Sequence, residues 1–220
     1  MAAGVTSHRP ARPRVVVLDY GSGNLHSAAR ALVAIGADVE VTSAREAALA
    51  ADALVVPGVG AFAACMAGLR GIGGPEIVDL RLAGDRPVLG ICVGMQVMFD
   101  SGVEHGVEAP GFGQWSGSIV PLQAPILPHM GWNTVRPAVD SALFAGLADE
   151  RFYFVHSFGA NGIGSGRSET LPAPRLAWCD YGGGFLAAVE DGPLAATQFH
   201  PEKSGDAGLT LLENWLETVR

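Results

Sequence analysis

The segment 87–94 constrains the fold of this chain more than any other part of the sequence. An apolar run leads directly into Cys92, and Gly90 and Gly94 stand on either side of the cysteine. A Gly-x-Cys-x-Gly sequence between a strand and a helix is typical of a nucleophile elbow, a tight turn that holds its central side chain alone above a sheet. We therefore expect a buried strand, a sharp turn at Cys92 and a helix over residues 93–99.

Strand-like and helix-like segments alternate along the first half of the chain. Apolar or β-branched runs at 14–19, 39–41, 53–56 and 87–91 alternate with helical patterns that begin after Asn24 and cover 61–69, 76–82 and 93–99. This alternation predicts an α/β fold of the flavodoxin-like kind, with a doubly wound, mostly parallel sheet and helices on both faces. Later strand-like runs at 117–122, 152–158, 185–189 and 194–199, and a closing helix over 204–219, predict antiparallel strands at the edge of that sheet.

Composition narrows the class of protein. Hydrophobic residues make up 49% of the 220 residues and charged residues 16%, which suits a largely buried sheet. The net charge of −8 disfavours nucleic acid and anionic membranes as partners. Residues 1–13 lack a hydrophobic signal core and are expected to form a disordered tail, followed by a single domain over 14–220. No apolar stretch reaches the length of a membrane span, so we expect a soluble, cytoplasmic protein.

The sequence offers no metal or cofactor site. Three widely spaced cysteines form neither a disulfide framework nor a zinc-binding pattern. Gly21 and Gly23 follow a strand as in a dinucleotide fingerprint, but His26 stands where the third glycine of that motif belongs. We therefore expect neither a bound metal nor a cofactor.

A second strand end carries the partners that a nucleophilic cysteine needs. The apolar run 194–199 ends at His200, and Glu202 follows two residues later. Ligands of such sheets bind at the carboxyl ends of strands, so the Cys92 thiol, an imidazole and a carboxylate can meet there as an acyl-transfer site. The alternatives are that Cys92 is a buried small hydrophobe and that Glu202 is a solvated residue of an ordinary turn.

A glycine-rich turn follows the strand predicted at 53–56. In it, Gly58 and Gly60 flank Val59 and leave main-chain N–H groups uncovered. The amides of Val59 or Gly60, together with that of Val93 after the cysteine, suit an oxyanion hole. The alternative is an ordinary strand-to-helix turn.

These motifs together resemble those of the triad (class I) glutamine amidotransferases. Residues 90–96 resemble the nucleophile motif of that class, and 200–202 its His-x-Glu motif. Within the class, the chain is most similar to the glutaminase subunits of imidazole glycerol phosphate synthase, through four further segments at 19–25, 57–62, 130–133 and 153–157 and a match that continues to Ser204.

The resemblance implies a class I amidotransferase fold and a role for each matching position. Cys92 would be the nucleophile, His200 the base and then the acid, and Glu202 the carboxylate that orients the imidazole. Val59, Gly60 and Val93 would supply oxyanion amides. The substrate L-glutamine would be held by residues in four parts of the chain: Gly58, Gln96, Glu104, His156 and Ser157.

The resemblance also implies a partner. Glutamine would be hydrolysed to glutamate and ammonia, and the ammonia passed to a separate (βα)₈-barrel cyclase subunit in a heterodimer. That complex would form imidazole glycerol phosphate and aminoimidazole carboxamide ribonucleotide in histidine biosynthesis. Three alternatives remain open: the glutaminase subunit of another synthase, such as pyridoxal phosphate synthase, a non-catalytic binding subunit of the same fold, and a stand-alone cysteine hydrolase.

Overall fold

The structure, a computed structural model, describes residues 12–104, 106–164 and 172–219. The predicted disordered tail therefore lies, apart from residues 12 and 13, outside the described residues. Among the helices of the described part, none is long and apolar enough to cross a membrane.

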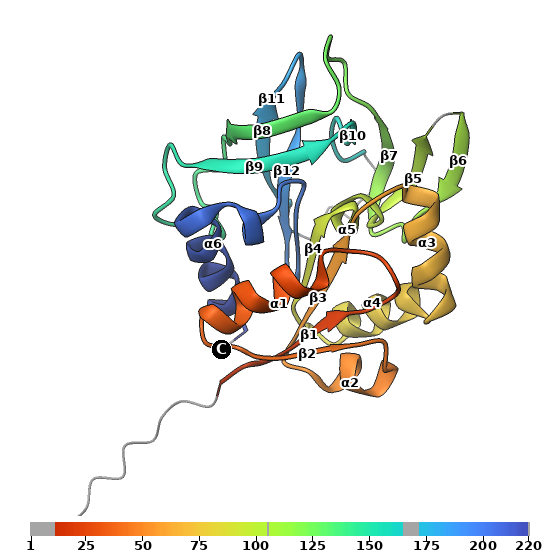
Figure 1. Cartoon of the computed structure of the whole chain (residues 1–220), viewed down its shortest axis with the longest axis vertical. Helices are drawn as coiled ribbons and strands as arrows, with labels where there is room; N and C mark the ends of the chain where they lie inside the picture. Colours follow the sequence, from red (N-terminus) through yellow and green to blue (C-terminus); the bar gives the residue numbers. More distant parts are fainter. Residues whose placement is uncertain (1–11, 105, 165–171, 220) are drawn as a thin grey trace, which may run out of the picture.

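A central sheet organises the described part of the chain (Figure 1). Its strands are β1 (Arg14–Leu18), β2 (Asp38–Thr42), β3 (Ala53–Gly58), β4 (Val88–Cys92), β11 (Arg175–Asp180), β12 (Gly184–Asp191) and β13 (Leu194–Thr197). They are arranged in the order β11-β12-β13-β4-β3-β1-β2. The strands from β13 to β2 run parallel, whereas β12 is antiparallel to both of its neighbours. The predicted mostly parallel sheet with antiparallel edge strands is confirmed.

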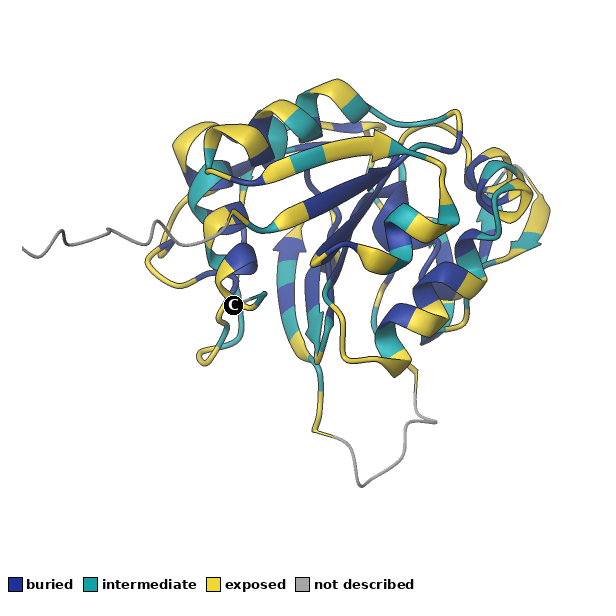
Figure 2. Ribbon diagram, turned by 90° about the horizontal axis from the view of Figure 1, so that it is seen from below, coloured by how far each residue is buried: buried dark blue, intermediate teal, exposed yellow. Residues whose placement is uncertain are grey.

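Helices cover both faces of this sheet (Figure 2). They are α1 (Leu25–Ala34), α2 (Arg45–Ala50), α3 (Phe62–Gly71), α4 (Gly74–Ala83), α5 (Val93–Gln96) and α6 (Gly205–Glu217), with a 3₁₀ turn η1 (Pro201–Lys203) before α6. The chain steps in one direction along the sheet from β1 to β2 and in the other from β3 to β4. Right-handed crossovers then place the intervening helices on opposite faces. Accordingly, α1 contacts α6, whereas α3 and α2 contact α4.

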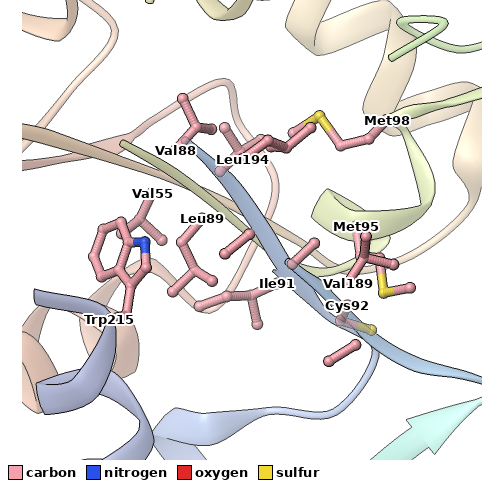
Figure 3. Packing of buried hydrophobic residues seen from close by; sticks show 14 of the residues in the cluster. Val55, Val88, Leu89, Ile91, Cys92, Met95, Met98, Val189, Leu194 and Trp215 are labelled. Atoms are coloured by element: carbon pink, nitrogen blue, oxygen red, sulfur yellow. The ribbon is translucent and has the colours of Figure 1, made fainter. Parts of the chain in front are cut away.

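The core lies between the sheet and these helices. Both faces of β3 and β4 are buried, which explains why their sequences are continuous apolar runs rather than alternating patterns. Figure 3 shows the packing of Val55 and Leu89 from these strands with Trp215 of α6. The centre of the sheet is therefore a rigid base for the loops at its carboxyl edge.

The second half of the chain differs from the prediction, because most of its strands form sheets of their own. β5 (Phe99–Glu104), β6 (Val107–Pro110), β7 (Trp115–Pro121) and β10 (Phe158–Gly159) form one sheet, and β8 (His129–Thr134) pairs with β9 (Arg151–His156) in another. The edge of the central sheet is already occupied by the antiparallel pair β11 and β12. Of these two strands, the sequence pattern indicated only β12.

The helix predicted over 93–99 is also wrong in its length. α5 ends at Gln96, and Phe99 begins strand β5. Phe99 pairs with Trp115 of β7, and their rings meet edge to face with centroids 5.4 Å apart. Sheet pairing and aromatic packing thus outweigh the helical spacing of this segment. The short helix α2 was not predicted either.

Candidate active site

The carboxyl ends of three adjacent strands converge on one point of the central sheet. β4 lies between β3 and β13, so Gly58 stands opposite Cys92 and Thr197 opposite Ile91. The residues that follow these strand ends are therefore neighbours in space. The turn after β3, Cys92 and His200 meet here, as expected from their positions in the sequence.

Cys92 occupies a sharp turn between β4 and α5. Its backbone has φ 57° and ψ −112°, a conformation that L-residues with a side chain rarely adopt. A Cβ on Gly94 would overlap the Val56 carbonyl, and one on Gly90 would collide with the carbonyl of Gly94. The two glycines are needed because β3, β4 and α5 approach so closely, while Cys92 itself takes the strained conformation typical of a nucleophile elbow.

His200 and Glu202 form a buried pair beside the cysteine. His200 Nδ1 donates to Glu202 Oε1 at 2.8 Å, and both side chains are only 2% exposed. His200 Nε2 is buried without a hydrogen-bond partner among the described residues, as is Glu202 Oε2. An unpaired buried nitrogen is costly, and at this position it is the atom that can exchange a proton with the thiol or a substrate.

The electrostatic surroundings favour the protonated imidazole. Burial by itself lowers the pKa of His200, but the neighbouring Cys92 sulfur and the Glu202 carboxylate outweigh it and raise this pKa to about 9. The pair of Cys92 and His200 therefore keeps a proton on the ring at neutral pH, ready for a leaving group.

A short network fixes the backbone that carries His200. The amide of His200 donates to the Tyr153 carbonyl at 2.9 Å. Ser204 Oγ donates to the His200 carbonyl at 2.7 Å and accepts from the Tyr153 amide at 3.0 Å. The histidine is thus anchored to β9, a strand of another sheet.

A cavity of about 210 Å³ opens in front of the thiol. Besides Cys92 and His200, it is lined by seven residues that the sequence predicted for glutamine binding or the oxyanion hole: Val59, Gly60, Val93, Gln96, Glu104, His156 and Ser157. Val155, Phe158 and Lys203 complete the lining and were not predicted. Gly58 and Glu202 do not line the cavity. A Cβ on Gly58 would lie 2.7 Å from the Gly94 nitrogen, so this glycine serves close packing behind the thiol.

Glu104 contacts a helix end as well as the cavity. Its Oε2 accepts a hydrogen bond of 3.0 Å from the amide of Phe62, the first residue of α3. A carboxylate near a helix N-terminus is stabilised by the unpaired amides there. Glu104 is therefore held in place with its negative charge at the cavity wall.

Several further side chains reach the site through contacts between distant segments of the chain. Ser22 and Cys65 hydrogen-bond the Val59 carbonyl, and Tyr20 donates to the Pro57 carbonyl at 2.7 Å. Gln198, two residues before His200, contacts Cys92. Two local signals could have drawn attention to some of them: Tyr20 and Ser22 lie in the segment 19–25 that carries the family resemblance, and Gln198 stands two residues before His200.

Comparisons with known proteins agree with this geometry. The family model described as "Glutamine amidotransferase class-I" matches residues 16–219. A protein of Nocardia farcinica named "Imidazole glycerol phosphate synthase subunit HisH" is 63% identical over 94% of this chain and 99% of its own length. A Streptomyces coelicolor protein of the same name is 56% identical, with full coverage of both chains.

Solved structures support the fold independently. A crystal structure described as that of a glutamine amidotransferase superposes with a TM-score of 0.71 at 20% identity and covers 93% of this chain and 98% of its own. The structure of PurLQS from Thermotoga maritima gives a TM-score of 0.66 at 15% identity, with 96% of this chain and 100% of the matched chain covered. The family model, the close relatives and the fold lead to the same assignment: this chain belongs to the class I glutamine amidotransferase family.

Proposed function

We propose that this chain is the glutaminase subunit of an imidazole glycerol phosphate synthase, acting in the cytoplasm through a Cys92–His200–Glu202 triad. Relatives that carry this name are 56–63% identical over nearly the whole chain. The observation that carries the chemistry is the buried His200–Glu202 pair, whose free ring nitrogen stands beside a strained cysteine at the wall of a cavity. We treat 14–220 as a single amidotransferase domain, in agreement with the extent of the family match.

In the first half of the reaction, Cys92 Sγ attacks the carboxamide carbon of glutamine, and negative charge develops on the carboxamide oxygen. Val59, Gly60 and Val93 line the cavity, and the amides of Val59 or Gly60 and of Val93 would meet this charge. Protonated His200 gives its Nε2 proton to the nitrogen, and ammonia leaves. A thioester between Cys92 and the glutamyl group remains.

In the second half, His200 is neutral and its Nε2 accepts a proton from water. The hydroxide so formed attacks the thioester carbon, and the same amides stabilise the oxyanion again. Glutamate leaves, and the proton on His200 restores the starting state. Glu202 holds the ring through Nδ1 in both halves, so the same nitrogen serves as acid and as base.

The ammonia requires an acceptor. In neutral water it would be protonated and lose its nucleophilicity, so it must pass directly to a second active site. We assign that site to a separate (βα)₈-barrel cyclase subunit in a heterodimer, which would add the ammonia to its nucleotide substrate and release imidazole glycerol phosphate and aminoimidazole carboxamide ribonucleotide.

An exposed apolar surface beside the cavity suits this partner. Met130 and Trp132 of β8 are 62% and 46% exposed. Met130 pairs with Val155 of the neighbouring strand β9, and Val155 lines the cavity. Large apolar side chains in the open are typical of protein contacts. A cyclase docked here would lie next to the place where ammonia is released.

The proposal is tested by glutamate release from glutamine, measured for the chain alone and with a barrel cyclase and its nucleotide acceptor. We expect activity near background alone and a many-fold increase with the loaded partner. Cys92→Ala should abolish the activity, whereas Cys179→Ala, which changes a buried cysteine away from the cavity, should retain it.

Two outcomes would contradict the proposal. Activity in the Cys92→Ala variant would exclude Cys92 as the nucleophile and with it the proposed triad. Strong activity of the chain alone that the cyclase does not change would retain the Cys-His-Glu chemistry and favour a stand-alone hydrolase or another synthase.

A further inference from the structure

The sulfur of Cys92 has a neighbour that the mechanism above does not use. Gln198 follows the end of β13, and its side chain is buried. Its Nε2 donates to Cys92 Sγ at 3.8 Å. Gln198 is 1% exposed, so its carboxamide must find hydrogen-bond partners inside the protein. The orientation of the carboxamide is therefore set by its neighbours.

Gln96 determines which end of the Gln198 amide faces the sulfur. The Phe158 carbonyl can only accept, so Gln96 presents its Nε2 to it, at 2.9 Å. The same Nε2 donates to Gln198 Oε1 at 3.0 Å. With its oxygen engaged by Gln96, Gln198 has its NH₂ group left for Cys92. The reverse orientation would bring two NH₂ groups together and a carbonyl oxygen against the thiol sulfur.

Two buried histidines fix the Phe158 carbonyl in turn. His156 Nδ1 lies 2.8 Å from it and must be the protonated nitrogen, so His156 Nε2 is an acceptor. His129 Nδ1 lies 3.0 Å from His156 Nε2 and therefore donates. His129 Nε2 can then accept from Asn133 Nδ2 at 3.4 Å. Only one set of proton positions satisfies the whole chain of contacts, from Asn133 to the sulfur.

The protonation states of the His129 and His156 rings agree with these proton positions. Burial lowers the pKa of His129 to about 4 and that of His156 to about 3. Both imidazoles are neutral at physiological pH, so each has one donor and one acceptor. The network is therefore fixed and does not reorient as the pH changes within the neutral range.

We propose that Gln198 is a further catalytic residue, whose carboxamide N–H donates to the Cys92 sulfur and stabilises it as a thiolate and as the leaving group of the thioester. Hydrogen bonds to a charged acceptor are stronger than those between neutral groups, so the contact gains strength when the sulfur becomes negative. Gln96 and the His129–His156 pair act as positioning residues for this donor. The inference rests on the proposed role of Cys92 as the nucleophile.

Two nearly isosteric variants of Gln198 distinguish a role as hydrogen-bond donor from a role in packing alone. Gln198→Met retains the length of the side chain but removes the donor and the acceptor. Gln198→Glu retains an oxygen for Gln96 and replaces the NH₂ group with a second oxygen. Gln114→Met is the matched control, because Gln114 hydrogen-bonds Asp79 and does not line the cavity.

The first readout is the rate of Cys92 alkylation by iodoacetamide in the full chain, followed by mass spectrometry across pH. It does not depend on turnover. We expect Gln198→Met to slow alkylation at pH 7 by roughly three- to tenfold and to move the midpoint of its pH profile upward. Gln198→Glu should slow it further, since a carboxylate would repel the thiolate. Gln114→Met should match the wild type.

The second readout is glutaminase activity in the complex with the cyclase, where both Gln198 variants should lose kcat with a smaller change in KM. Wild-type pH profiles in both variants would overturn the inference, as would a Gln198→Glu variant as reactive as the wild type, because a purely structural residue would tolerate that change. Thermal unfolding of each variant identifies losses that come from misfolding. If the proposed triad is wrong, the Cys92→Ala variant will be active, which distinguishes that outcome from a failure of the inference about Gln198.

Discussion

The hydroxyl of Ser22 donates a 2.7 Å hydrogen bond to the carbonyl oxygen of Val59, 37 residues further along the chain. Cys65 Sγ donates to the same oxygen at 3.3 Å. In a trans peptide the carbonyl and the following N–H point in opposite directions. By holding the Val59 carbonyl, these two side chains also set the direction of the Gly60 N–H, one of the proposed oxyanion donors.

Ser22→Ala tests this arrangement. The loss of one neutral hydrogen bond, worth about 1 kcal/mol, should lower kcat for glutamine hydrolysis in the cyclase complex by roughly fivefold. KM should change little, because Ser22 does not line the cavity. Ser118→Ala, which removes an exposed contact with Ser101, is the control. An unchanged kcat in Ser22→Ala would mean that Cys65 and the backbone suffice to orient the Gly60 amide.

Val59→Pro removes a candidate oxyanion donor directly, because proline has no N–H. Loss of one such donor costs roughly 3–4 kcal/mol in other enzymes, so glutaminase activity should fall by about two to three orders of magnitude. Binding to the cyclase should remain nearly intact. Val59→Ala retains the amide and should stay active. Comparable activity of the proline variant and the alanine variant would exclude the Val59 N–H as a donor.

Glu104→Gln separates the charge of this residue from its hydrogen bond. An amide oxygen can still accept from Phe62, so thermal stability should change little, but the negative charge at the cavity wall disappears. In the proposed site, Glu104 would bind the α-ammonium group of glutamine. Loss of this charged hydrogen bond should raise KM for glutamine by about tenfold. Steady-state kinetics in the cyclase complex measure this. A normal KM would leave Glu104 with a purely structural role at the N-terminus of α3.

The sequence predicts that Cys92, His200 and Glu202 lie close together, because each stands at a fixed offset from a strand end. Cys92 closes β4 and His200 follows β13, and both strands read as continuous apolar runs. A strand buried on both faces leaves this signature, and parallel strands bring their carboxyl ends to one edge. The placement of these residues at one edge of the central sheet was therefore accessible from local patterns.

The parts of the site and fold that the sequence did not predict depend on contacts between distant segments. Gln198 lies 106 residues from Cys92, and His129 lies 27 residues from His156. Nothing in the local pattern around His129 separates a buried ring from an exposed one. The early end of α5 has the same cause, since Phe99 leaves the helix to pair with Trp115. Such contacts are decided by packing across the molecule, which periodicity does not encode.

The buried histidine pair should make the protein less stable in acid. Burial lowers the pKa of His129 from 6.5 to about 4, so below pH 6.5 the unfolded chain binds a proton that the folded protein does not. The stability contributed by this residue is complete above pH 6.5 and is lost as the pH falls toward 4. His129→Phe preserves stacking on Tyr181 and should flatten the decline in the free energy of unfolding over this range. Urea titrations between pH 4 and 7 measure the slope, and an unchanged slope would assign the acid sensitivity to other groups.

The His200–Glu202 pair should give the opposite pH dependence of stability, with a loss at alkaline pH. The folded-state pKa of His200, about 9, lies above its ordinary value of 6.5, so the folded protein binds this proton more tightly than the unfolded chain. The stability from this group is complete below pH 6.5 and is lost as the pH rises through about 9. Glu202→Gln removes the carboxylate that holds Nδ1 and should bring the histidine pKa back toward its ordinary value, which reduces the decline in the free energy of unfolding between pH 7 and 9. Denaturant unfolding of both proteins across that range tests this. A decline as steep in Glu202→Gln as in the wild type would mean that Cys92, rather than Glu202, retains the proton on the ring.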